Sequence, residues 1–171
     1  PEPSDEDYDA ALAAAQAAML KVGLTGAHDM GTGIEDWNAL RRAGRAGALK
    51  VRISSYAAGL PAWRILNEGA PTGWEFNDRL ILLGTKLYAD GALGSRGAWL
   101  KRPYADRPDS RGLSLIATAE LTKAAEEVAN GRGQLAIHAI GDAANEQVIG
   151  VLEALGAKWG RFHRSRIEHL P

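Results

Sequence analysis

Side chains that bind metal ions or carry protons recur at or just after the apolar segments of this chain. They are His28-Asp29, Lys86, Asp90, His138 and Glu168-His169. Neutral imidazole is the commonest metal ligand in proteins, and a buried lysine amine loses its proton readily. A single such residue has an ordinary structural explanation, since lysines extend their amines to solvent and histidines form hydrogen bonds. Their recurrence in successive segments favours a metal site.

The elements that must position these residues alternate along the chain. We expect strands over residues 24–28, 51–55, 80–88, 134–139 and 164–169. The helices between them are expected to begin at the N-caps Ser4, Thr118 and Asp142 and at Pro61, with one more around residues 34–40. Residues 98–116 are expected to form an irregular excursion over the surface.

This alternation predicts a parallel sheet with helices outside it. An open doubly wound sheet and part of a (β/α) barrel are both consistent with it. In both architectures the chemistry takes place at the carboxyl ends of the strands.

Composition narrows the class of protein. The 171 residues are enough for one domain with a sizeable core. The net charge of -1 and the scattered basic residues indicate neither a nucleic-acid surface nor a membrane surface, and there is no cysteine. The chain begins with Pro1 and ends with Pro171, and both termini have the character of cut ends. We expect a small-molecule substrate, and a cytoplasmic location is favoured.

Four segments together resemble a known family: GLTGAHDMG, LYADGALGSRGAWL, LAIHAIGDAANEQVI and RIEHLP. They are similar to the successive motifs of the amidohydrolase superfamily, and most similar to amidohydrolase family 3, which includes N-substituted formamide deformylases. The resemblance covers nearly the whole chain. It implies that residues 1–171 form the interior portion of a (β/α)8 TIM-like barrel, with about five parallel strands that correspond to strands two to six of the family, and with helices outside them.

The resemblance also implies a site and a reaction. Lys86 corresponds to the family's lysine that carbon dioxide carboxylates and that bridges two metal ions, and His138 and His169 correspond to histidine ligands. The expected cofactor is a divalent metal, zinc, as one or two ions, with a metal-bound hydroxide as nucleophile. The expected reaction is hydrolysis of carbon–nitrogen bonds in non-peptide amides or formamides. From the loop after Lys86, Asp90 and Arg96 are expected to contact substrate, although an Asp-Gly turn explains Asp90 equally well.

Parts of the family's pattern do not occur in this sequence. The His-x-His pair of strand one and the proton-shuttling aspartate of a later strand have no counterpart here. We therefore expect this chain to be inactive alone, and to self-associate through unpaired strand edges or to pack against the rest of a parent chain. His28 is expected to have a supporting or structural role. The alternative function is a non-catalytic α/β binding or assembly module that retains the motifs.

Overall fold

The structure is a computed structural model that describes residues 3–160 and 164–170. The chain divides into two compact units, Pro1–Thr85 and Lys86–Pro171. Its strands form a five-stranded sheet in which the order β1-β2-β3-β4-β5 follows the chain. Strand β3, Leu80–Tyr88, has the bounds expected from the sequence and carries the boundary between the units.

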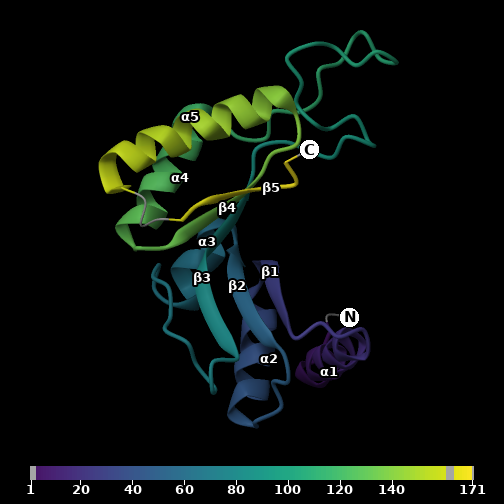
Figure 1. The fold of residues 1–171 in the computed structure, drawn as a ribbon, viewed down its shortest axis with the longest axis vertical. Coiled ribbons are helices and arrows are strands. Elements are labelled where there is room, and N and C mark those ends of the chain that lie inside the picture. Colours follow the sequence, from purple (N-terminus) through teal and green to yellow (C-terminus); the bar gives the residue numbers. More distant parts are fainter. Residues whose placement is uncertain (1–2, 161–163, 171) are drawn as a thin grey trace. The chain divides into compact units, whose positions relative to one another are not determined.

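The first unit alternates helices and strands (Figure 1). It contains α1 (Asp5–Lys21), β1 (Gly26–Thr32), α2 (Ile34–Arg45), β2 (Arg52–Ala58) and α3 (Gly59–Leu66). Strands β1 and β2 are parallel. The apolar core includes Trp37, Leu40, Val51, Tyr56 and Trp63.

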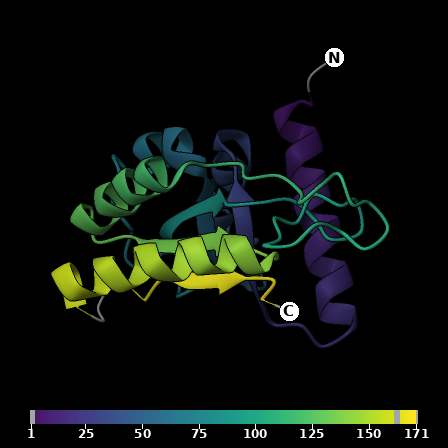
Figure 2. The same cartoon turned by 90° about the horizontal axis from the view of Figure 1, so that it is seen from above.

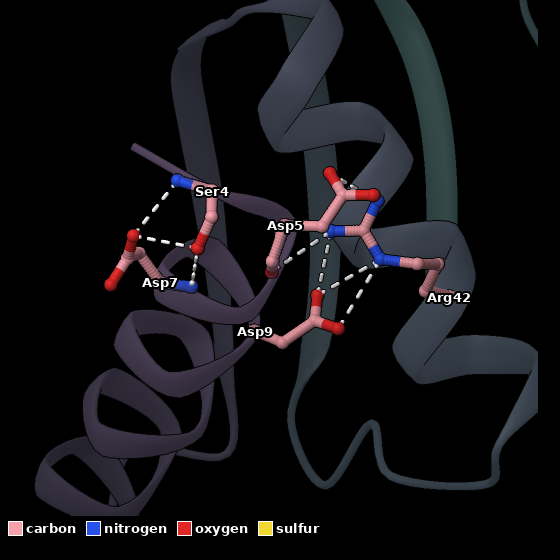
Figure 3. A network of polar contacts seen from close by, with 5 residues as sticks. All are labelled: Ser4, Asp5, Asp7, Asp9 and Arg42. Carbon is pink, nitrogen blue, oxygen red and sulfur yellow. Dashed lines mark hydrogen bonds and ion pairs between the residues drawn. The ribbon is translucent and has the colours of Figure 1, made fainter. Parts of the chain in front are cut away.

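Polar contacts hold α1 on this unit. The Arg42 guanidinium of α2 donates to the Asp9 carboxylate at 2.8 Å and pairs with the Asp5 carboxylate at 3.1 Å (Figure 3). Gln16 is the buried residue of α1, and its side-chain oxygen accepts from the Lys50 amide at 2.6 Å. Ser4 forms the expected N-cap and shares a capping box with Asp7 (Figure 3). A cavity of about 460 Å³ lies between the apolar side of α1 and strands β1 and β2.

The second unit contains the end of β3, then α4 (Thr118–Asn130), β4 (Gln134–His138), α5 (Asp142–Trp159) and β5 (Arg166–Glu168). Strands β4 and β5 are parallel, with His138 opposite Glu168. Helices α4 and α5 lie side by side next to these strands (Figures 1 and 2). Leu121, Val128, Leu135, Ile137 and Val148 are buried in this unit. No helix within the described residues has both the length and the apolar character that a membrane span requires.

Strand β1 is longer than the sequence predicted. Residues 29–32, which lie beyond the expected end of the strand at residue 28, belong to it, and the register with β2 shifts between Met30 and Thr32. Gly31 lies at this irregularity with a φ of 143°, a backbone conformation that glycine tolerates and other residues rarely adopt. His28 therefore lies within the strand rather than at its end.

Three predicted helix starts are wrong by one or two residues. The N-caps are Ala117 and Gly141, so Thr118 and Asp142 are already helical. The Asp142 carboxylate instead accepts from the amide of Lys101, a residue far away in the sequence. Pro61 is the third residue of α3, not the first.

Candidate metal centre

Asp90 organises the loop that follows β3. Its side chain is buried, and its Oδ2 accepts hydrogen bonds from the amides of Gly141, at 2.7 Å, and Trp99, at 2.9 Å. Its Oδ1 accepts from the amide of Ile140 at 3.0 Å. The Asp90 carboxylate thus links three segments by hydrogen bonds: the turn after β3, the loop backbone at Trp99, and the turn after β4.

Trp99 crosses the start of α5 in close contact with its backbone. The Trp99 carbonyl accepts from the amides of Ala143 and Ala144, at 3.2 and 3.4 Å. A side chain at Gly141 would bring a Cβ within 1.8 Å of the same carbonyl oxygen, so this position requires glycine. The predicted surface excursion is therefore anchored at its beginning, although most of residues 101–111 are exposed.

Lys86 is buried in β3, with 2 % of its surface exposed. Burial lowers the pKa of its amine, and the negative charge of Glu168 partly opposes this effect. The Lys86 Nζ lies 4.0 Å from the centroid of the Tyr88 ring. Since residues two apart in a strand share a face, the amine and this ring lie on the same side of β3.

His138 is the last residue of β4 and lies beside the loop that Asp90 holds. Its Nε2 is 3.3 Å from the carbonyl oxygen of Gly91 and 3.5 Å from Asp90 Oδ1. Its ring also lies beside Tyr88, with centroids 5.5 Å apart. His138 therefore has an aromatic neighbour from β3 and hydrogen-bond acceptors from the loop after it.

His169 follows β5 directly. Its ring centroid is 4.8 Å from that of His138, and the planes meet at 61°. Glu168 is the residue paired with His138, and neighbouring residues of a strand point to opposite faces. In regular strand geometry His169 would therefore point to the face opposite to that of Glu168. The backbone of His169 has a φ of 67°, so the chain leaves the strand geometry where this ring approaches His138.

The structure thus brings two predicted ligands together and places the third nearby. His138 and His169 are neighbours, and the Tyr88 ring contacts both the Lys86 amine and the His138 ring. In the described part of the chain, no group of three His, Cys, Asp or Glu side chains is arranged to hold a metal. Two imidazoles and a buried amine with a lowered pKa suit a divalent ion if the lysine becomes an anionic ligand.

The two residues expected to contact substrate have different surroundings. Asp90 turns both carboxylate oxygens towards backbone amides. Arg96 is exposed, has a φ of 56°, and pairs with Asp106 of the same loop, with Nε 3.1 Å from Oδ2. Substrate contact by either residue stays a prediction.

Sequence reasoning overlooked Tyr88 in this region, although its position two residues after Lys86 in a predicted strand places both on one face. It named Glu168 at a strand end but not the proximity of Glu168 to Lys86, which depends on strand register. His28 lies in the other unit, exposed on β1, with its ring stacked on Tyr56 at a centroid distance of 6.2 Å.

Comparisons with known proteins relate this chain to one family of enzymes. The model of the amidohydrolase family matches residues 1–171. The putative amidohydrolase YtcJ of Bacillus subtilis is 32 % identical over 176 aligned residues, covering 96 % of this chain and 31 % of YtcJ. The Arabidopsis thaliana protein LONG AFTER FAR-RED 3 is 36 % identical over 107 residues, covering 62 % of this chain and 18 % of that protein.

Two solved structures have the same fold. An uncharacterised metal-dependent hydrolase from Pyrococcus horikoshii superposes with a TM-score of 0.85 at 26 % identity, covering 96 % of this chain and 37 % of that one. Another from Pyrococcus furiosus has a TM-score of 0.80 at 30 % identity, covering 90 % and 32 %. The chain thus spans about a third of three of these proteins and less of the fourth. The expected fold, part of a barrel with five parallel strands and outer helices, is confirmed. The chain belongs to the amidohydrolase family.

Proposed function

We propose that the full-length protein carrying this chain is a metal-dependent hydrolase of carbon–nitrogen bonds in non-peptide amides or formamides. The observation that supports it is the pairing of the His138 and His169 rings, 4.8 Å apart, in the unit that also holds the buried Lys86. The relatives are named as a putative amidohydrolase and as metal-dependent hydrolases, which supports the hydrolase part of this proposal.

In this proposal His138 and His169 bind a divalent ion, with zinc favoured because neutral imidazole suits it. Such an ion supplies a nucleophile by lowering the pKa of bound water and polarises the scissile carbonyl. Lys86 contributes once its amine has added carbon dioxide. The amine nitrogen would bond to the carbon of carbon dioxide and lose a proton to solvent, which would leave an anionic carbamate able to serve as a further ligand for the divalent metal.

The burial of Lys86 favours this modification. Burial lowers the amine's pKa, so more of it is uncharged and nucleophilic. The nearby Tyr88 ring acts in the opposite direction, since an aromatic face attracts an ammonium group. We therefore expect carboxylation to depend on metal, whose positive charge stabilises the carbamate.

The test uses the full-length protein, stripped of metal by a chelator and of carbon dioxide by degassing. Zinc and bicarbonate together should restore hydrolysis of a formamide or amide panel. The Lys86→Ala variant should have no activity, and bicarbonate should have no effect on it. Lys158→Ala, which removes an exposed lysine paired with Glu126, is the matched control and should behave as wild type.

Two outcomes would contradict the proposal. If Lys86→Ala binds two zinc ions as tightly as the parent, the bridging carbamate is wrong. If His138→Ala and His169→Ala both retain zinc at parent affinity, the metal site itself is wrong. In that case a non-catalytic binding or assembly module becomes the better description.

A further inference from the structure

The contacts of His138 specify which of its nitrogens carries the proton. Nε2 has two oxygens as neighbours, the Gly91 carbonyl at 3.3 Å and Asp90 Oδ1 at 3.5 Å. A carbonyl oxygen accepts hydrogen bonds and cannot donate them, and a carboxylate behaves in the same way. Nε2 therefore presents an N–H. A neutral imidazole has one N–H, so Nδ1 keeps its lone pair and is available as a ligand.

Asp90 fixes the position of both acceptors. Its carboxylate is immobilised by the amides of Trp99, Ile140 and Gly141, at 2.9, 3.0 and 2.7 Å. Gly91 is the next residue, so the same anchor places its carbonyl. The Ala89 amide also donates to the His138 carbonyl at 2.9 Å, which fixes the loop to the end of β4.

We propose that Asp90 is a positioning residue that, together with the Gly91 carbonyl, holds His138 in the Nε2–H tautomer and leaves Nδ1 as the metal-binding nitrogen. This inference rests on the metal site proposed above. Metal-binding histidines commonly donate their second N–H to a carboxylate or a backbone carbonyl, and removal of that partner lowers metal affinity about 10–100-fold. In this role Asp90 acts through His138.

Asp90→Asn is the informative variant, because the geometry dictates how the amide must lie. The oxygen at the Oδ2 position accepts from two backbone amides and that at Oδ1 from one. The asparagine oxygen therefore takes the Oδ2 position, and its NH2 group takes the Oδ1 position beside His138 Nε2. Two donors then face each other, so the Nε2–H tautomer is disfavoured.

The experiment uses the full-length protein with ¹⁵N-labelled histidine. In the metal-free wild type, nitrogen shifts of the His138 ring, assigned by comparison with His138→Ala, should show the proton on Nε2. In Asp90→Asn the Nδ1–H form should gain population, and zinc affinity, measured by competition with a chelating dye, should fall about 10–100-fold. Asp142→Asn is the matched control. It also removes one negative charge from a carboxylate that bonds the loop, at Lys101, to helix α5, but this carboxylate lies away from His138. It should leave the tautomer unchanged and zinc affinity within about twofold, as for ordinary surface substitutions.

The outcomes separate this inference from the proposed function. Wild-type His138 with its proton on Nδ1 overturns the inference, whether or not any variant folds. The inference alone is also overturned if His138→Ala loses zinc while Asp90→Asn keeps parent affinity and tautomer. If His138→Ala binds zinc as the parent does, the proposed metal site is wrong. The tautomer measurement still tests the protonation of His138 independently.

Discussion

Gly141→Ala should be among the most damaging small substitutions in this chain. The added Cβ would lie 1.8 Å from the carbonyl oxygen of Trp99 and 2.3 Å from its carbonyl carbon. Gly141 itself has a φ of -67° and a ψ of 150°, which alanine adopts without strain. The cost therefore comes from the collision with backbone atoms and not from the dihedral angles of alanine.

The size of the destabilisation follows from the displacement of Trp99 that the added Cβ requires. Displacing Trp99 strains the loop, and overpacking of this kind costs about 1–3 kcal/mol. The hydrogen bond from the Gly141 amide to Asp90, at 2.7 Å, is weakened as well, and bonds to charged groups contribute about 1.5–3 kcal/mol. We expect a loss of at least about 3 kcal/mol in the free energy of unfolding of this region.

Urea unfolding of the full-length protein measures the loss, and trypsin cleavage after the exposed Arg111 reports release of the loop. Gly150→Ala is the matched control, because it lies in the same helix and its added Cβ meets no atom within 4 Å. That variant should be stabilised by about 0.5–1 kcal/mol. A Gly141→Ala protein as stable and as trypsin-resistant as wild type would refute the close approach of Trp99 to α5.

Other predictions concern the first unit. Burial, and to a lesser degree the charge of Asp36, raises the pKa of Asp29 in the folded state. The folded protein therefore loses stability as pH rises from about 3.9 through this raised pKa. Asp29→Asn should unfold at a higher urea concentration than wild type at pH 7 and at the same urea concentration at pH 3. Asp9→Asn should lower the melting temperature slightly at low salt and not at about 1 M salt, because its ion pair with Arg42 is largely exposed to screening. Gly44→Ala should destabilise by about 1–3 kcal/mol in urea unfolding, since its Cβ would lie 2.3 Å from a ring carbon of Phe76; an unchanged midpoint would show that this ring moves freely.

Local patterns predicted the elements that depend on local chemistry. The aliphatic run of β3 gave its bounds correctly, and Ser4 caps α1 through a capping box within one turn. Asp142 also has a capping side chain, but its carboxylate accepts from Lys101 instead, a tertiary contact that no local pattern contains. Similarly, β1 continues through Gly31 because an irregular register with β2 accommodates it.

The candidate site was predictable in its residue types and less so in its geometry. Strand-end position alone placed His138 and Lys86 in neighbouring strands. It did not predict the turn that brings His169 to His138, because that depends on a positive φ at a residue that is not glycine. The role of Asp90 also escaped prediction, since its partners Ile140 and Gly141 lie about fifty residues further along the chain.

Anomalous diffraction at the zinc edge, from crystals of the full-length protein grown with zinc and bicarbonate, shows whether His138 and His169 bind the metal. We expect zinc bonded to nitrogens of both histidines at about 2.0–2.1 Å, with Nδ1 as the donor of His138. We also expect extra density for a carboxylate on Lys86 Nζ, shared between two metal ions. Zinc bound elsewhere while both imidazoles remain without metal would contradict the assignment of this site.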